Sequence, residues 1–247
     1  MKTLKGIILA AGKGTRMKNF NQPKSTLKIK KNFTIMDNLI SNFRKNHINE
    51  IFMVTGFKSN YFKKYDVKKI NNKNWKKTNM FNSLLCADKI LVKSPCVVSY
   101  ADIVYDNSAI RLLKNTKSEI VICYYSKWLE LWKKRFSDPL SDAEVFRLNK
   151  KNFLKEIGSK PKSLKEVEGQ YMGLLYFTPP GWKKIKKILK KIKLKKINKA
   201  SMTKILSIVI DNGVNVKAIK YKSYFAEMDS PKDYKIFKKD FKRVKFD

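Results

Sequence analysis

The sequence predicts an α/β protein built around one mainly parallel sheet, and three observations support this prediction. Short apolar runs alternate with amphipathic segments of helical period through the first half of the chain. The first apolar run, residues 3–9, leads directly into a glycine-rich turn. A later run ends at Asp102, and the carboxyl ends of parallel strands are where such sheets bind ligands.

The first half supplies most of the expected sheet. Its strands are expected over the apolar segments 3–9, 49–55, 66–71, 96–101 and 118–124. Its helices are expected at 34–46, near 58–64 and directly after Thr78 or Asn79, since both of these residues are sound N-caps. Because strands alternate with helices, the strands are expected to run mostly parallel.

The second half has a different character. Residues 143–149 and 152–158 alternate in hydropathy around a turn at 150–151, which predicts a hairpin. Trp128 and Trp132 lie four apart, on one helix face. Further elements are expected at 182–197 (helix), 198–211 (helix), 214–220 (strand) and after Ser230 (helix). The chain shows no internal repeat, linker or composition break, so a single domain over residues 1–247 is expected.

Composition excludes several classes of protein and site. No apolar run is long enough for a transmembrane helix, and the chain starts too close to its first strand for a signal peptide, so a cytoplasmic protein is expected. The single histidine, His47, and three scattered cysteines exclude a zinc cluster. The cysteines, Cys86, Cys96 and Cys123, are expected in the core. Any metal must therefore be held by carboxylates, which favours Mg²⁺ or Mn²⁺.

The formal net charge of +36 raises the question of an anionic partner. Only six of the 56 basic residues are arginine, the residue that nucleic-acid readers commonly use, so a bias toward lysine is favoured over nucleic-acid binding. The basic amphipathic segment 182–197 could face an anionic membrane. Such a stripe more often faces a core, and core packing is expected here.

The segment from residue 10 to residue 24 has the features of a phosphate-binding loop. It contains Ala-Ala-Gly-Lys-Gly-Thr-Arg-Met over residues 10–17 and Pro-Lys at 23–24. Glycines allow backbone N–H groups to approach anionic oxygens. Arg16 and Lys24 add cations that can neutralise a transferring phosphate. A Gly-x-Gly turn by itself would suit an ordinary strand-to-helix connection equally well.

This motif as a whole resembles the signature of nucleotidyltransferases, which join a nucleoside monophosphate to a sugar phosphate or a small phosphate ester. The resemblance extends from residue 5 to about 235. It implies a Rossmann-like three-layer α/β fold with a mainly parallel central mixed sheet and a small acceptor-binding β insertion. It also implies a nucleotide-binding part at about 1–125 and an acceptor-binding part at about 126–230.

The second half is similar to cytidylyltransferases. Residues 138–144 and 168–173 resemble the tracts of enzymes that act on small phosphonates, such as 2-aminoethylphosphonate or 2-hydroxyethylphosphonate. The resemblance therefore implies transfer of CMP from CTP to such a phosphonate, with release of pyrophosphate. Residues 99–105 also resemble phosphoglutamine cytidylyltransferases, and phosphocholine cytidylyltransferases are more distant relatives. Phosphoglutamine, phosphocholine or a sugar 1-phosphate thus remain alternative acceptors.

The resemblance implies roles for individual residues. Arg16 and Lys24 would be catalytic, and Asp102 and Asp229 would hold Mg²⁺, with Mn²⁺ as a substitute. From the residues alone, Asp102 could be a helix cap or a surface acid, and Asp229 could belong to a helix start that Ser230 caps. The nucleotide-binding set would be Leu9, Ala10, Ala11, Gly12, Gly14, Thr15, Gly56, Thr78, Asn79, Ser83 and Ala101. The acceptor-binding set would be Lys160, Glu168, Gln170, Tyr171 and Glu227.

The glycines around Gln170 and Tyr171 have two explanations, a backbone held close to a ligand or a structural bulge. The expected partners are CTP and a small phosphonate or phosphorylated acceptor, with neither a nucleic acid nor a membrane. The chain is expected to act as a monomer or a homodimer.

Overall fold

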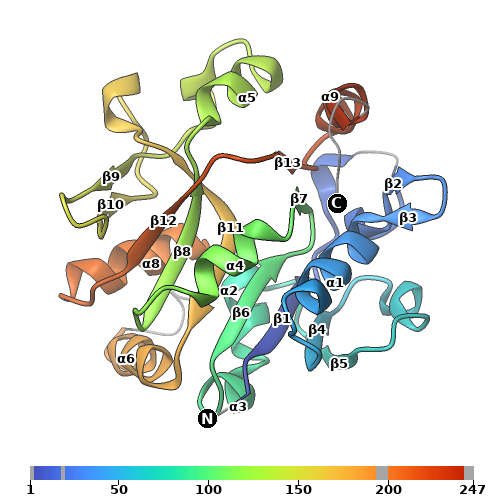
Figure 1. Cartoon of the computed structure of the whole chain (residues 1–247), viewed down its shortest axis with the longest axis horizontal. Helices are drawn as coiled ribbons and strands as arrows, with labels where there is room; N and C mark the ends of the chain where they lie inside the picture. The colour runs from blue at the N-terminus through green and yellow to red at the C-terminus, as the bar shows by residue number, and fades with distance from the viewer. Residues whose placement is uncertain (1–2, 18–19, 193–199, 242–247) are drawn as a thin grey trace.

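The structure, a computed structural model, describes residues 3–17, 20–192 and 200–241. Its central strands are β1 (Lys5–Ala10), β4 (Ile51–Thr55), β5 (Lys68–Asn71), β6 (Cys96–Tyr100), β8 (Ile120–Tyr125), β11 (Gln170–Phe177) and β12 (Lys217–Tyr221). They form one seven-stranded sheet in the order β12-β8-β11-β6-β1-β4-β5 (Figure 1). Only β11 runs antiparallel to its neighbours, β6 and β8. The predicted mainly parallel mixed sheet is confirmed.

Three two-stranded sheets flank the central one. They pair β2 (Lys28–Lys30) with β3 (Phe33–Thr34), β7 (Ile103–Tyr105) with β13 (Phe225–Glu227), and β9 (Phe146–Leu148) with β10 (Leu154–Ile157). The last pair is antiparallel and confirms the predicted hairpin. The other two were not predicted, because strands of two or three residues are too short to show alternating hydropathy.

The α-helices lie on both faces of the sheet (Figure 1). They are α1 (Ile35–Lys45), α2 (Met80–Leu85), α3 (Asp88–Leu91), α4 (Ser108–Lys114), α5 (Trp128–Arg135), α6 (Pro179–Lys190), α8 (Met202–Asp211) and α9 (Pro231–Phe241). Helix α4 was not predicted. The segment expected as a helix near 58–64 is only a 3-10 turn, Ser59–Phe62. Its N-cap, Lys58, has a left-handed backbone (φ 45°) and provides no side-chain cap, so nothing starts a longer helix.

The helix starts follow the expected capping chemistry. Thr34 and Asp37 form a reciprocal capping box at α1, and Asn79, rather than Thr78, caps α2. At α9 the Ser230 hydroxyl accepts from the Asp233 backbone N–H, and Asp233 accepts from the Ser230 backbone N–H. Residues 193–199, which include parts of the two helices expected at 182–197 and 198–211, lie outside the described residues.

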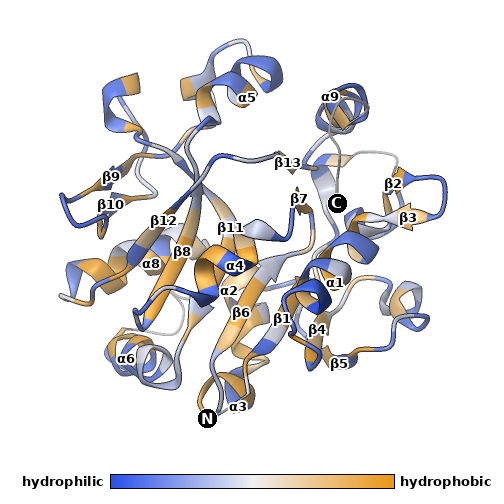
Figure 2. Ribbon diagram, in the orientation of Figure 1, coloured by the Kyte–Doolittle hydropathy of each residue, from blue (hydrophilic) through white to orange (hydrophobic). Residues whose placement is uncertain are grey.

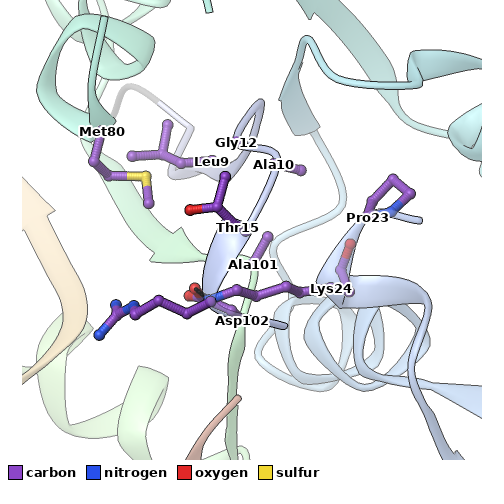
Figure 3. A pocket seen from close by; sticks show the side chains of 12 residues that line it. Leu9, Ala10, Gly12, Thr15, Pro23, Lys24, Met80, Ala101 and Asp102 are labelled. Atoms are coloured by element: carbon purple, nitrogen blue, oxygen red, sulfur yellow. Dashed lines mark hydrogen bonds and ion pairs between the residues drawn. The ribbon is translucent and has the colours of Figure 1, made fainter. Parts of the chain in front are cut away.

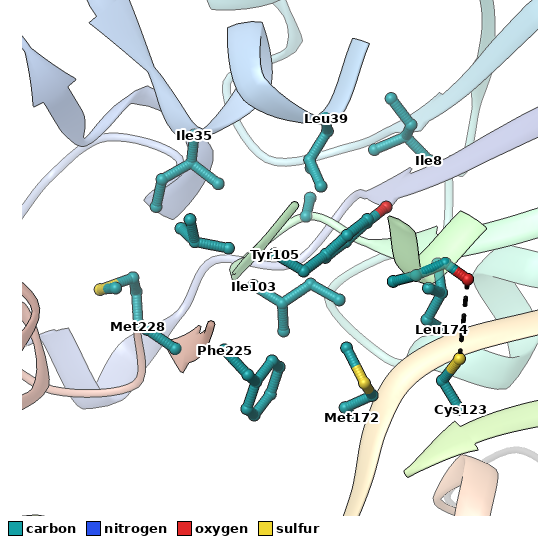
Figure 4. Packing of buried hydrophobic residues seen from close by; sticks show 14 of the residues in the cluster. Ile8, Ile35, Leu39, Ile103, Tyr105, Cys123, Met172, Leu174, Phe225 and Met228 are labelled. Carbon is teal, nitrogen blue, oxygen red and sulfur yellow. Dashed lines mark hydrogen bonds between the residues drawn. The ribbon is translucent and has the colours of Figure 1, made fainter. Parts of the chain in front are cut away.

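Two apolar clusters cover the two faces of the sheet. Figure 4 shows part of the first, in which α1, β7 and β11 pack together around Ile8, Leu39 and Tyr105. The second lies under α2, α6 and α8. Trp182, Ile185 and Leu189 of α6 are buried in it, which confirms core packing for this basic helix. In Figure 2 the strands of the sheet are largely orange, while many of the outer loops are blue.

Some side chains differ from expectation. Cys96 and Cys123 are buried, but Cys86 is exposed, so the prediction of three core cysteines was wrong there. Phe81 and Leu84 form the buried face of α2, and Cys86 lies just past the helix end, off that face. Trp128 and Trp132 are both buried with ring centroids 6.1 Å apart, as their spacing predicts. No helix among the described residues is long and apolar enough to cross a membrane.

Candidate active site

The glycine-rich loop begins where β1 ends and turns back across the carboxyl edge of the sheet. Gly14 adopts φ +66°, and a Cβ at this position would lie 2.6 Å from Cε of Lys24. Only glycine therefore fits, both for its backbone and for its space. The loop leaves room for the Lys24 side chain to reach the end of β6.

Two acids that are far apart in the sequence meet at this point. Strand β13 pairs with β7 so that Glu227 lies opposite Ile103, and the Met228 N–H donates to the Asp102 carbonyl over 2.8 Å. This pairing places Asp229 next to Asp102. The predicted convergence of residues 102 and 229 with the glycine loop is therefore what the structure shows.

Lys24 joins the two acids. Its Nζ lies 3.1 Å from Asp102 Oδ2 and 2.7 Å from Asp229 Oδ1. Burial by itself would lower the pKa of Lys24, but the charges of Asp102 and Asp229 outweigh it, so the pKa is raised. Arg16 Nη2 also contacts Asp229 Oδ1, at 2.8 Å, and its side chain remains 64 % exposed. Of these two cations, Lys24 is buried and Arg16 is largely exposed.

Arg135 supports Asp229 from behind, and the sequence reasoning missed it. Its side chain is 2 % exposed and contacts Asp229 Oδ2 at 3.3 Å, Asp233 Oδ1 at 2.9 Å and Glu227 Oε2 at 3.0 Å. Burial would raise the pKa of Asp229, but Lys24, Arg16 and Arg135 together lower it. The scarcity of arginine in the sequence could have pointed to Arg135, since two of the chain's six arginines contact the Asp229 carboxylate.

Arg16, Lys24 and Asp102 line a cleft of about 260 Å³, and Asp229, which contacts both cations, is not among its lining residues (Figure 3). Its lining combines the loop after β1, the Pro-Lys segment, the first residue of α2 and the end of β6. The lining residues are Leu9, Ala10, Gly12, Gly14, Thr15, Arg16, Pro23, Lys24, Ser25, Met80, Ala101 and Asp102. Both predicted catalytic residues and the metal candidate Asp102 are among them. Met80, which was not predicted, follows the helix cap directly.

Five residues of the predicted nucleotide-binding set do not line this cleft. They are Ala11, Gly56, Thr78, Asn79 and Ser83. Gly56 lies behind the loop, where a Cβ would come within 2.8 Å of the Ala11 carbonyl oxygen. Buried Asn72, which was not predicted, donates to the Thr78 and Ser83 hydroxyls. These polar groups therefore brace the start of α2, one residue from the cleft.

The predicted acceptor-binding residues are spread over several elements. Exposed Lys160 donates to the Leu140 and Ser141 carbonyls. Glu168 accepts from the Leu148 N–H over 3.0 Å. Gln170, Tyr171 and Glu227 lie deeper, Gln170 being buried and Glu227 bonded to Arg135. The Tyr171 hydroxyl is buried and has no hydrogen-bond partner among the described residues.

The carboxylates fit the hard, oxygen-preferring cations that the composition favours. Asp102 Oδ1 is buried and no described residue donates to it. An orphaned carboxylate oxygen beside a second carboxylate suits Mg²⁺, which proteins commonly bind through one or two carboxylates and substrate phosphates. Within the described ranges no group of three or more His, Cys, Asp or Glu side chains could hold a metal on its own. A metal here would depend on ligand oxygens.

Comparison with known proteins identifies a family and a relative. A MobA-like NTP transferase domain matches residues 6–171. A CTP:phosphoglutamine cytidylyltransferase from Campylobacter jejuni is 32 % identical over 252 residues, which cover 94 % of this chain and 98 % of the relative.

Solved structures show the same fold. The CTP:phosphocholine cytidylyltransferase of Streptococcus pneumoniae superposes with a TM-score of 0.73 at 18 % identity, covering 97 % of this chain and 99 % of the other. The inositol-1-phosphate CTP transferase of T. maritima gives a TM-score of 0.74 at 17 % identity, covering 96 % and 94 %. At these identities the likeness concerns the fold. The family match over more than half of the chain, with the relative similar along nearly its whole length, shows that this protein is a nucleotidyltransferase of the MobA-like NTP transferase family.

Proposed function

We propose that the chain transfers CMP from CTP to a small phosphorylated acceptor and releases pyrophosphate. The observation that carries the proposal is the meeting of Lys24, Asp102 and Asp229 beside the glycine-rich loop. The relative that is 32 % identical along nearly the whole chain is named as a CTP-dependent enzyme, which supports CTP as the donor.

In this reaction an oxygen of the acceptor phosphate attacks the α-phosphorus of CTP in line, and the bond to pyrophosphate breaks. The attacking oxygen is already anionic at neutral pH, because the second pKa of such groups is about 6. No general base is needed, which agrees with a chain that has one histidine, His47, outside the site lining. Catalysis then consists of positioning and of neutralising charge.

The chain supplies these functions through separate groups. Lys24 stays protonated and stabilises the charge that develops on the α-phosphate. Backbone N–H groups of the glycine loop bind phosphate oxygens. Arg16, which is largely exposed, exchanges its contact with Asp229 for the β- and γ-phosphates. Asp102 and Asp229 would hold Mg²⁺, which would supply positive charge to the phosphates. The segment around Thr78, Asn79 and Ser83 would orient α2 for recognition of the base.

For the acceptor we favour phosphoglutamine, because the Campylobacter relative is named for it and covers almost the whole chain. Small phosphonates, which the tracts at 138–144 and 168–173 suggested, remain the second candidate. We place the acceptor between Asp102 and Tyr171, with Glu227 at its side. In this arrangement Gln170, Glu168 and Lys160 hold the surrounding loops, as their bonds to backbone groups suggest.

Pyrophosphate release tests the proposal. Each nucleoside triphosphate is combined with phosphoglutamine, 2-aminoethylphosphonate, 2-hydroxyethylphosphonate, phosphocholine and glucose 1-phosphate, with and without Mg²⁺. We expect release with CTP and either phosphoglutamine or one of the two small phosphonates, dependent on Mg²⁺. The proposal would be overturned if pyrophosphate were released only with glucose 1-phosphate, or if none of these acceptors supported its release.

Asp229→Asn is the matching variant, and we expect turnover to fall by about 10²–10³-fold, the usual cost of losing one preorganised charge. Asp211→Asn is the control, because Asp211 lies at the end of α8 and accepts from the Ser207 hydroxyl at the surface. Equal turnover in the two variants would show that Asp229 takes no part in the reaction.

A further inference from the structure

Glu144 lies just before β9 and is held in place by both its backbone and its side chain. The Gln170 side chain accepts from the Glu144 N–H over 3.2 Å and donates to the Glu144 carbonyl over 2.7 Å. The carboxylate oxygen Oε1 accepts from the Thr203 hydroxyl at the start of α8, over 3.1 Å. Buried Gln170 thereby fixes Glu144 to the end of β11.

This carboxylate has no cationic partner within the described part of the chain. None of the ion pairs there includes it, although the protein has 56 lysines and arginines. Burial, followed by the charge of Asp142, raises the pKa of Glu144, against the Thr203 hydrogen bond. A partly buried carboxylate without a counterion is costly, most of all where cations are abundant on the surface. A ligand that brings a positive charge to Glu144 would offset this cost.

Two tyrosines connect Glu144 with the reaction centre. The ring of Tyr171 meets the ring of Tyr100 edge-on, with centroids 5.9 Å apart. Tyr100 directly precedes the cleft-lining pair Ala101 and Asp102. Gln170, which bonds to the backbone of Glu144, directly precedes Tyr171.

The Tyr171 hydroxyl is buried and has no hydrogen-bond partner among the residues described. Burial raises the pKa of this hydroxyl, and the neighbouring Tyr100 and the charge of Glu144 raise it further. The Tyr171 hydroxyl and the carboxylate of Glu144, whose one side-chain partner is the Thr203 hydroxyl, can together accept two hydrogen bonds from one ammonium group, which has three donors. The Glu144 carboxylate does not suit a phosphate, because an ionised carboxylate presents only oxygen lone pairs and negative charge to it.

We propose that Glu144, together with the Tyr171 hydroxyl, binds a positively charged amino group of the acceptor. The acceptor is then a zwitterion, with its phosphoryl group at Lys24 and its ammonium group at Glu144. This inference rests on the proposed function and adds to it the charge of the acceptor's far end. It assigns specificity to a residue that does not touch the reacting atoms.

A purely structural role for Glu144 predicts something different. Its carboxylate lies at the start of α8, where Ser201 is the N-cap, and a negative charge there stabilises a helix. In that case Glu144→Gln would lower stability and affect all acceptors equally. Recognition of an amino group predicts a loss confined to acceptors that carry one.

The experiment compares 2-aminoethylphosphonate with ethylphosphonate, and phosphoglutamine with its analogue in which hydrogen replaces the α-ammonium group. CTP-dependent pyrophosphate release gives kcat/KM for each, in wild type, in Glu144→Gln and in Glu156→Gln. Glu156 is the matched control, since its carboxylate likewise accepts from a hydroxyl, that of Ser159, at an exposed site. Urea unfolding of each variant reports the structural contribution.

We expect wild type and Glu156→Gln to prefer the amino-bearing member of the pair, and Glu144→Gln to lose this preference by about tenfold or more, mainly through KM. A preference that survives in Glu144→Gln, or a wild type that uses both members equally, overturns the inference while leaving cytidylyl transfer intact. Absence of pyrophosphate release with every acceptor overturns the proposed function itself.

Discussion

Replacing Lys24 with methionine separates the structural role of this lysine from its catalytic role. Methionine keeps most of the buried volume but removes the cation between Asp102 and Asp229. Removing one partner of a buried ion pair costs about 3–5 kcal/mol of unfolding free energy. Asp229 retains Arg16 and Arg135, so mainly Asp102 loses its partner. We therefore expect the lower end, about 3 kcal/mol.

The pH dependence of this loss has a definite sign. The folded-state pKa of Asp229 lies below its ordinary value of 3.8, so its stabilisation is present above that value and lost as pH falls through the folded-state pKa. The pKa of Lys24 lies above 10.5, so its stabilisation is present below 10.5 and lost as pH rises through the folded-state pKa. The deficit of Lys24→Met should thus be complete near neutral pH and shrink in strong acid.

Urea unfolding at pH 7 measures the stability, and pyrophosphate release measures the turnover. A small domain is stable by about 5–15 kcal/mol, so the variant should stay folded while turnover falls by about 10²–10³-fold. Lys184→Met is the control, because Lys184 pairs with Glu119 at the surface, where such a pair contributes about 1 kcal/mol or less. A folded Lys24→Met enzyme with turnover within about tenfold of wild type would refute the reasoning.

Three further variants test the surroundings of the site. Arg135→Met leaves three carboxylates without their shared cation and should lower the unfolding free energy by about 3–5 kcal/mol; Arg135→Lys should recover part of it, and an unchanged urea midpoint in both would contradict this. Gly173→Ala places a Cβ 2.8 Å from the Tyr100 ring, on a backbone of φ +76°. It should lower the unfolding free energy by about 1–3 kcal/mol, measured by thermal unfolding. Gly213→Ala is the comparison, because Gly213 has φ +77° but lies in open space. Burial would raise the pKa of Asp106, but its hydrogen bonds outweigh burial and lower the pKa below its ordinary value of 3.8. Asp106→Asn should therefore be less stable than wild type at pH 7, and the difference should shrink as pH falls below 3.8, whereas a constant difference would exclude this linkage.

The local part of the fold could be predicted because it depends on short-range patterns. A buried strand needs only a run of apolar residues, and an N-cap needs only the right side chain at one position, as Thr34 and Asn79 show. The glycine loop was recognisable for the same reason, since Gly14 answers to a local steric demand. These local features predicted Arg16 and Lys24 as residues of the site, and both line the cleft.

The longer-range part depended on pairings that leave no local trace. Asp102 meets Asp229 because the three-residue strands β7 and β13 pair although about half of the chain separates them, and strands this short have no readable period. Arg135 is one basic residue among many in a lysine-rich segment until folding buries it against three acids. The loss of solvent gives these charges their roles, and solvent is excluded only when distant segments pack together.

The amino-acid sequence by itself therefore determined the buried strands of the sheet, the phosphate-binding loop and the class of reaction, since each depends on residues that are neighbours in the chain. Only the tertiary structure decided which charges share partners. It placed Lys24 between two acids and gave Glu144 a hydroxyl partner but no cation from residues 3–17, 20–192 and 200–241, because burial and distance between side chains are properties of the packed fold.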